Sequence, residues 1–406
     1  MPTAAETAFP MRALLAGARR KERSLLDLTR KLVQAESPSD TKSAVDACVA
    51  LAAAHLKQLG GRIKLHRQND HGNALEARFG LRSTRTRESV QPILLLGHLD
   101  TVWPLGTIHS MRCRVRDGRL WGPGTLDMKA GVAMAATALE LLIEARLLRR
   151  EIILLLNGDE EIGSPASRPI TEDLARECSA VYVLEPAQGL AYKTARKGIG
   201  DWHIQVKGVA AHAGVDFEKG ANALRELARV IETVSGWTDL KRGLTVSVGV
   251  AAGGTKSNVV PAAAHADIDV RIPRLADGPR IARKFAALGP TDPRCTLVVT
   301  GQINRPPMER SRGTVRLFRR AQALAGELGF ELNEASTGGG SDGNFTAALG
   351  IPTLDGMGAV GEGAHARHES VVVEHLALRT ALLAGLLAGC NSAGTPDKLP
   401  RRTTRS

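Results

Sequence analysis

Acidic and histidine side chains that could bind a metal ion follow two short apolar runs of this 406-residue chain. His98 and Asp100 come just after the run 90–96, and the acidic run 159–161 comes just after the run 151–156. Neighbouring carboxylates repel one another unless a cation or a shared proton neutralises them. In such a run one carboxylate can bind a metal while its neighbour serves as a general base.

Three further side chains could complete a metal site. Asp127 follows the glycine-rich turn 122–124, Glu185 ends the apolar run 180–184, and His365 lies in a glycine-rich segment. Carboxylate oxygens with imidazole nitrogens suit zinc, cobalt or manganese. Each feature also has an ordinary structural interpretation, such as a helix-capping aspartate or a hydrogen-bonded histidine at a strand end.

The apolar runs that precede these residues predict strands of an α/β fold. Continuous apolar runs are typical of parallel strands buried on both faces, and here they alternate with helical patterns. We expect strands at 90–96, 151–156, 180–184 and 352–354. We expect helices at 24–34, 43–59, 129–148, 315–328, 342–349 and 373–388.

Between these two parts the pattern indicates an inserted α+β open sandwich. Alternating strands are predicted at 201–207, 244–250, 265–272 and 295–300, with helices at 221–234 and 278–288. The domains are therefore expected at 1–196 (catalytic, first part), 197–307 (inserted lid), 308–390 (catalytic, second part) and 391–406 (a disordered tail).

Composition excludes several other classes of protein. No run reaches the ~18–20 apolar residues of a membrane span, and the first 30 residues contain no secretory signal pattern. Five cysteines, none at C-x-x-C spacing, favour reduced thiols in the cytoplasm. The net charge of +12 comes largely from the two ends, so we expect solvated basic tails rather than nucleic-acid binding. The tail residues are Arg19, Arg20, Lys21, Arg23, Lys398, Arg401, Arg402 and Arg405.

The order of the motifs resembles one enzyme family. H-x-D (98–100), G-x-G-x-x-D-M-K (122–129), D-E-E-x-G (159–163), E-P (185–186) and the segment with His365 occur in that order. This pattern is similar to that of the di-zinc metallopeptidases, which include bacterial glutamate carboxypeptidase, aminoacylase, acetylornithine deacetylase and succinyl-diaminopimelate desuccinylase. The resemblance covers residues from about 26 to 390, including the insert.

The resemblance implies two zinc ions, with cobalt or manganese as substitutes. Asp127 would bridge them, His98 and Glu185 would complete one site, and Glu161 and His365 the other. Asp100 would orient His98, and Glu160 would be the general base. The Asp127–Met128 peptide would be cis. His368 stands where the family often has an aspartate, which makes it the alternative to His365; the offset to Glu369 favours His365.

In the inserted domain, the resemblance implies residues that contact the substrate. His212 would polarise the scissile carbonyl, often across a homodimer formed through the lid. Asn258, Arg271 and Arg305 would hold a free carboxylate of the substrate, which a guanidinium binds through paired hydrogen bonds. Gly339 belongs to a glycine loop beside that carboxylate, and the helix start at Asp342 is expected to add an anion cradle.

The reaction implied is hydrolysis of the amide bond that joins an acyl group to a C-terminal amino acid. Within the family, the glycine loop and the segment 304–307 look closest to the glutamate carboxypeptidase branch. An N-acyl amino-acid deacylase or a dipeptidase would use the same site. A catalytically silent binding protein is the alternative from another class. Neither nucleic acid nor membrane is expected as a partner.

Overall fold

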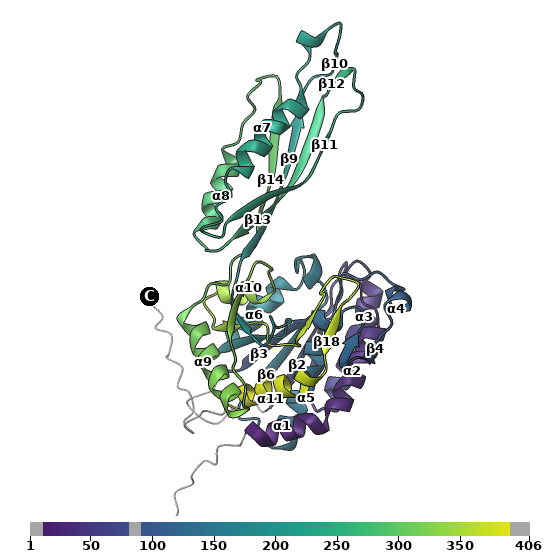
Figure 1. The fold of residues 1–406 in the computed structure, drawn as a ribbon, viewed down its shortest axis with the longest axis vertical. Helices are drawn as coiled ribbons and strands as arrows, with labels where there is room; N and C mark the ends of the chain where they lie inside the picture. The colour runs from purple at the N-terminus through teal and green to yellow at the C-terminus, as the bar shows by residue number, and fades with distance from the viewer. Residues whose placement is uncertain (1–10, 81–90, 390–406) are drawn as a thin grey trace, which may run out of the picture. The chain divides into compact units, whose positions relative to one another are not determined.

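The computed structural model describes residues 11–80 and 91–389, which form two compact units (Figure 1). The lid unit contains residues 195–309 and the segment Thr337–Gly340; the large unit contains the other described residues. The sequence analysis set the insert at 197–307 and left 337–340 in the catalytic domain. That segment groups with the lid because Lys197 N donates to Thr337 O (3.0 Å) and Arg196 Nη1 donates to Gly340 O (2.9 Å).

The large unit contains a six-stranded, mainly parallel sheet with strand order β1-β2-β6-β3-β7-β16. Strands β6, β3, β7 and β16 run parallel, and β2 is antiparallel to both of its neighbours. The bounds are β1 Arg62–His66, β2 Ala74–Phe79, β3 Ile93–His98, β6 Ile152–Asn157, β7 Ala180–Val183 and β16 Thr353–Leu354. The prediction of a mostly parallel sheet is therefore confirmed.

Helices pack on both faces of this sheet because its strands are apolar on both sides. In β3, Ile93 and Leu95 join one core cluster while Leu94 and Leu96 join another. The first cluster includes residues of α1 Met11–Arg20, α2 Glu22–Gln34, α3 Lys42–Gln58, α5 Ala130–Glu144, α9 Arg312–Glu327 and α11 Glu374–Ala388. The second includes α6 Arg168–Glu177, which contacts α10 Gly343–Ala348.

A four-stranded sheet and several short helical segments complete the large unit. The sheet has the order β17-β18-β5-β4, and β15 pairs with β8, two strands whose last residues belong to the lid unit. Their bounds are β4 Arg114–Arg116, β5 Arg119–Trp121, β8 Tyr192–Arg196, β15 Glu334–Thr337, β17 Gly361–Glu362 and β18 Ser370–Val372. The short segments are α4 Thr107–Ser110, η1 Thr125–Lys129 and η2 Glu160–Ile162. Asp127 lies within η1, and His365 lies in the segment between β17 and β18.

The first basic cluster lies in a packed helix and the turn after it, so the prediction of a solvated tail is wrong there. Helix α1 buries Met11, Leu14 and Ala18 in the main core. Lys21 forms ion pairs with Glu140 (2.9 Å) and Glu144 (2.7 Å) of α5. The basic residues are the exposed side of an amphipathic segment. The second basic cluster and the tail 391–406 lie outside the described residues, as does Val90 of the predicted strand.

The lid unit is an open sandwich with one four-stranded antiparallel sheet, ordered β11-β13-β9-β14. Its strands are β9 Gly198–Lys207, β11 Thr245–Gly253, β13 Ala263–Ile272 and β14 Thr296–Arg305. Helices α7 Ala223–Ser235 and α8 Asp277–Ala286 pack on one face, with Phe285 stacked on Trp202 (Figure 1). A short pair, β10 Ala211–His212 with β12 Val259–Val260, and the turn η3 Phe217–Lys219 complete it.

No helix within the described part of the chain has the length and apolar character needed to cross a membrane.

Candidate metal centre

The candidate metal centre is built where three parallel strands end. His98 is the last residue of β3 and pairs with Asn157, the last residue of β6, while Leu96 pairs with Val183 at the end of β7. Because these strands are parallel neighbours, the residues that follow them lie at one edge of the sheet. This register explains how His98, Glu160, Glu161 and Glu185 come together from distant parts of the sequence.

His98 is fully buried and faces carboxylates with its Nε2 atom. That atom lies 3.1 Å from Asp127 Oδ1 and 3.6 Å from Glu185 Oε1. On the other side of the ring, Nδ1 lies 3.0 Å from the Asp100 carbonyl oxygen and 3.4 Å from its carboxylate Oδ1. The nearest partner of Nδ1 is therefore the backbone of Asp100, rather than the carboxylate that the sequence analysis expected. Either oxygen leaves Nε2 as the atom available to a metal.

The Asp100 carboxylate holds the acidic turn after β6. Its Oδ1 accepts a hydrogen bond from Glu160 N (3.2 Å), and its Oδ2 accepts bonds from Glu161 N (3.1 Å) and Ser39 Oγ (2.7 Å). These bonds satisfy a carboxylate with no exposed surface, and they fix the backbone that presents Glu160 and Glu161. Asp100 thus connects two of the loops that supply candidate ligands.

His365 occupies the opposite side of Asp127. Its Nε2 lies 3.3 Å from Asp127 Oδ2 and 3.2 Å from Glu161 Oε2. The backbone of His365 has φ = 62°, in the left-handed region that non-glycine residues adopt uncommonly. His368 instead packs closely against Gly363, where an added Cβ would meet its Cδ2 at 2.8 Å. The geometry favours His365 over His368 as a ligand.

The arrangement of Asp127 fits a pair of metal ions. One carboxylate oxygen faces His98 and the other faces His365, and the Asp127–Met128 peptide is cis, as the resemblance implied. Tetrahedral zinc with bonds of about 2.0–2.1 Å places neighbouring ligand atoms about 3.3 Å apart, close to the 3.1–3.6 Å separations observed.

Two trios of side chains have ligand atoms that all lie within 4.8 Å of one another: His98, Asp127, Glu161 and His98, Glu160, Glu185. His365 adds to the first through Asp127 and Glu161. Glu161 Oε1 is buried with no hydrogen-bond partner among the described residues, as expected of an oxygen reserved for a cation. The residues present therefore fit divalent metal ions.

The clustered carboxylates of the site need positive charge close to them. Hydrogen bonds with Asp127 and Glu161 raise the pKa of His365 to about 10. Burial lowers the pKa of His98, but hydrogen bonds with Asp100 and Asp127 outweigh it and hold that pKa well above its ordinary value. Burial raises the pKa of Glu161, a sign that its charged form lacks solvation. Without metal, a proton on His365 takes the place of a cation, and the raised pKa of His98 acts in the same direction.

In the lid unit, His212 and Asn258 lie together. His212 on β10 pairs with Val259 on β12, directly after Asn258, and Ala213 N donates to Asn258 O (3.0 Å). Gly214 N donates to His212 Nδ1 (3.2 Å), which leaves Nε2 as the outward-facing ring nitrogen.

Arg271 and Arg305 lie together near the other end of the lid sheet. Both pair with Ile199 of β9, from its two sides, so their side chains share a face. Asp269 binds the Arg271 guanidinium through several hydrogen bonds of 2.7–3.1 Å. The Gly339 loop lies on the same face, because a Cβ at Gly340 would meet Ile199 and Arg305 at 2.6 and 3.1 Å.

These two pairs are too far apart to hold one carboxylate. The eight residue steps along β13 from Ala263 to Arg271 span about 26 Å, and β12 lies beyond Ala263. Figure 1 likewise places β10 and β12 at one end of the lid unit. The expectation that Asn258 acts beside Arg271 and Arg305 is therefore wrong within one copy of the chain. Sequence order could not reveal which end of the sheet each residue occupies.

The predicted anion cradle at Asp342 is not formed. Ser341 N donates to Asn344 Oδ1 (3.0 Å) and Gly343 N donates to Ser341 Oγ (3.1 Å), so these amides are already used. The Asp342 carboxylate accepts a bond from Asn157 Nδ2 (2.6 Å) and is buried there. A negative charge at this position disfavours a second anion.

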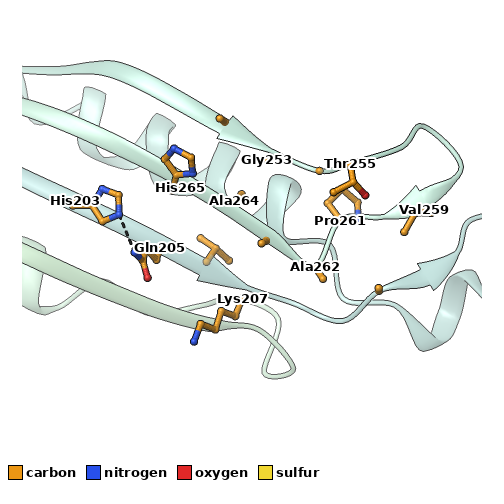
Figure 2. Close-up of a pocket in the computed structure, with 15 residues that line it drawn as sticks. His203, Gln205, Lys207, Gly253, Thr255, Val259, Pro261, Ala262, Ala264 and His265 are labelled. Atoms are coloured by element: carbon orange, nitrogen blue, oxygen red, sulfur yellow. Dashed lines mark hydrogen bonds between the residues drawn. The ribbon is translucent and has the colours of Figure 1, made fainter.

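A groove of about 700 Å³ lies on the lid sheet face opposite its helices (Figure 2). His203, Gln205 and Lys207 of β9 and His265 of β13 line it in a row. None of its lining residues is a carboxylate, so it lacks the donor set of the metal centre.

Sequence reasoning gave Glu369 no function, but the structure places it beside Asp127. Its carboxylate accepts hydrogen bonds from the amides of Gly124, Leu126 and Asp127. The motif that contains His365 also contains Glu369, but the motif alone does not predict which backbone amides its carboxylate binds.

Comparison with known proteins agrees with this geometry. A family model described as peptidase family M20/M25/M40 matches residues 94–389. Carboxypeptidase G2 of Pseudomonas sp. (strain RS-16) is 31% identical over 281 residues, 67% of each chain. A succinyl-diaminopimelate desuccinylase of Stenotrophomonas maltophilia (strain K279a) is 29% identical over 382 residues, 87% of this chain and 95% of the relative.

Solved structures show the same fold. Aminopeptidase PepT from Bacillus cereus ATCC 10987 superposes with a TM-score of 0.76 at 23% identity, over 90% of this chain and 98% of that one. The M20 family metallo-carboxypeptidase Sso-CP2 from Sulfolobus solfataricus gives a TM-score of 0.69 at 17% identity, with the same coverage.

Proposed function

The chain belongs to peptidase family M20/M25/M40, a family of metal-dependent hydrolases, and on that premise we propose that it is a di-zinc carboxypeptidase-like enzyme. It would cleave an amide bond and release a C-terminal amino acid. The observation that supports this most strongly is the position of Asp127, whose two carboxylate oxygens each face a different imidazole. A carboxylate shared by two metal ions directs its two oxygens in this way.

In the proposed mechanism, Asp127 would be shared by two ions, His98 and Glu185 would hold one of them, and Glu161 and His365 would hold the other. When bound, the metal would lower the pKa of a water molecule and polarise the scissile carbonyl. Glu160, held by Asp100 next to His98, accepts the proton of the attacking water and then passes it to the leaving amine. His212 donates a hydrogen bond to the developing oxyanion.

Recognition of the substrate carboxylate is assigned to Arg271 and Arg305, with the Gly339 loop beside them. Arg305 is largely buried at the end of β14, and the glycine loop packs against its side chain. A guanidinium in such a place binds a carboxylate through charge-assisted hydrogen bonds. Asp269 holds the Arg271 guanidinium, and Arg305 is the more deeply buried of the two arginines.

A deacylase is the second candidate function. The relatives that align over most of this chain include desuccinylases, whereas carboxypeptidase G2 is more similar over a shorter region. Both activities require the same metal ligands and differ in the acyl group.

A substrate panel tests the proposal. The zinc-loaded protein is assayed with folate-type glutamate amides, dipeptides, N-acetyl amino acids and N-succinyl amino acids. We expect the highest kcat/KM for the glutamate amides, and we expect Arg305→Ala to raise KM about tenfold or more. Preference for N-succinyl substrates would favour the deacylase. No turnover of any amide with zinc, cobalt or manganese would overturn the assignment as a hydrolase.

We also propose that the enzyme is a homodimer formed through the lid, with His212 and Asn258 serving the active site of the partner. Support comes from the separation of about 26 Å within one lid, since a single copy cannot offer both ends to one small substrate. The edge strand β11 has the exposed backbone that pairing with a second copy would use.

A cytoplasmic location, with no nucleic-acid or membrane partner, completes the proposal. Cys48, Cys113, Cys178 and Cys295 are free thiols, which is typical of a reducing compartment.

A further inference from the structure

Glu369 connects three loops of the metal centre, although it is not one of the proposed metal ligands. Its Oε1 accepts hydrogen bonds from Leu126 N (2.9 Å) and Asp127 N (3.1 Å). Its Oε2 accepts bonds from Gly124 N (2.9 Å) and Trp103 Nε1 (2.8 Å). The side chain is 1% exposed, and both oxygens are fully used.

The amides that Glu369 binds lack the partners that a regular helix would give them. Asp127 has φ = −113° and ψ = 94°, which is not helical, in the turn that precedes α5. Buried backbone N–H groups without acceptors cost free energy, so this turn depends on an acceptor from elsewhere. The Glu369 carboxylate is this acceptor for the amides of Leu126, Asp127 and Gly124.

Glu369 also belongs to the loop that contains His365. Its own amide donates to Ala366 O (2.9 Å), and Gly122 N donates to Glu369 O (3.3 Å). The side chain therefore ties the turn 122–127 to the loop 363–369, and Trp103 ties both to the segment after Asp100. The Asp127–His365 separation of 3.3 Å depends on how these loops are joined.

We propose that Glu369 is a positioning residue that sets the bridging carboxylate of Asp127 against His365. This inference rests on the proposed metal site but concerns a residue outside it. Glutamate suits the position because all four of its partners are donors. Glutamine has the same size, but its NH₂ group would face N–H groups. Aspartate is shorter by one methylene and cannot reach both sets of donors.

Two measurements test the proposal on full-length protein. Hydrogen exchange, followed by mass spectrometry on the metal-free protein, reports on the peptide 122–129. Zinc titration against a chromophoric chelator reports on affinity. The variants are Glu369→Gln, Glu369→Asp and Trp103→Phe, with Glu362→Gln as the matched control. Glu362 lies on β17 of the same hairpin, is exposed, and pairs with Arg119.

For Glu369→Gln we expect at least tenfold faster exchange in that peptide and a 10–100-fold loss of zinc affinity. For Glu369→Asp, the exchange rate and the zinc affinity should lie between those of Glu369→Gln and wild type. Trp103→Phe should change each of these two quantities by less than threefold. Exchange elsewhere stays unchanged. If Glu369→Gln fails to fold, Glu369→Asp decides the question by the same two measurements.

Exchange and zinc affinity within twofold of the Glu362→Gln control would overturn the inference. A wild-type protein that binds no divalent cation would instead overturn the proposed function. In that case the exchange measurement still decides whether Glu369 holds the turn.

Discussion

Five carboxylates and two imidazoles meet in the metal centre, and their charges do not balance without a cation. The charge of the Asp100 carboxylate needs no cation, because this carboxylate accepts hydrogen bonds from backbone amides and from Ser39. Asp127 has a lowered pKa because its hydrogen bonds with His365 and His98 outweigh burial. Protons and metal ions therefore compete for the same imidazole nitrogens.

Glu160 is predicted to be needed for turnover and not for metal binding. Glu160→Gln keeps the size of the side chain and removes its basicity, so kcat should fall about 10²–10⁴-fold. Metal content, measured by mass spectrometry of the purified protein, should equal that of the wild type. Loss of metal would make Glu160 a ligand, and kcat within a few-fold of wild type would remove it from proton transfer.

Metal binding at pH 8 is predicted to release at least one proton, that of His365. In the metal-free protein the pKa of His365 is about 10, so its imidazole is protonated at pH 8, and the raised pKa of His98 adds to the release as the pH falls. Because metals bind neutral imidazole, affinity should rise with pH until about 10 and then level off. Calorimetry in two buffers of different ionisation enthalpy measures the release.

Two variants identify the histidine that loses its proton when metal binds. His365→Ala should release about one proton fewer than wild type. His368→Ala should behave as wild type, because His368 packs against Gly363 rather than facing Asp127. The opposite result would make His368 the ligand.

Continuous apolar runs predicted the elements that build the site. Strands β3, β6 and β7 are buried on both faces, so their sequences are apolar throughout and their ends are recognisable. The strands β4, β5, β17 and β18 were not predicted, since each has two or three residues and no periodic pattern. The candidate metal ligands were predicted from the order of the motifs, and the contacts of Glu369 were not, because they depend on tertiary structure.

Helix α1 was missed for a different reason. It is only ten residues long, and the basic cluster at its end was interpreted as part of a solvated tail. In the structure, Met11 packs so closely on α11 that a Cβ at Gly385 would meet its sulfur at 2.5 Å. Charge at the exposed side of a helix does not show whether its other side is buried.

The packing of α1 predicts a measurable contribution to stability. Leu14 is 2% exposed, so Leu14→Ala should lower the free energy of unfolding by about 2–5 kcal/mol in urea titrations. Arg19→Ala, at an exposed position of the same helix, should change it by about 0.5 kcal/mol or less. Equal effects of the two substitutions would show that α1 does not contribute to the core.

The distance between the two ends of the lid unit limits which residues one active site can use. His212 and Asn258 lie at one end, and Arg271 and Arg305 lie about 26 Å away along β13. All proposed metal ligands belong to the large unit, and the proposed function assigns residues at both ends of the lid to catalysis or to substrate binding. A symmetric dimer accommodates both ends if each lid contributes one end to its own site and the other end to the partner's site.

Complementation between two inactive variants tests this arrangement. His212→Ala and Glu160→Gln are co-expressed with different tags, and the mixed dimer is purified through both tags. If His212 acts on the partner's site, one of the two sites contains both an intact Glu160 and an intact His212. That site should give about half of the wild-type kcat per dimer. If His212 acts within its own subunit, each site lacks one residue and activity does not return. Pairing Glu160→Gln with Asp127→Ala gives the matched control, because both changes lie in the large unit and neither arrangement restores a site.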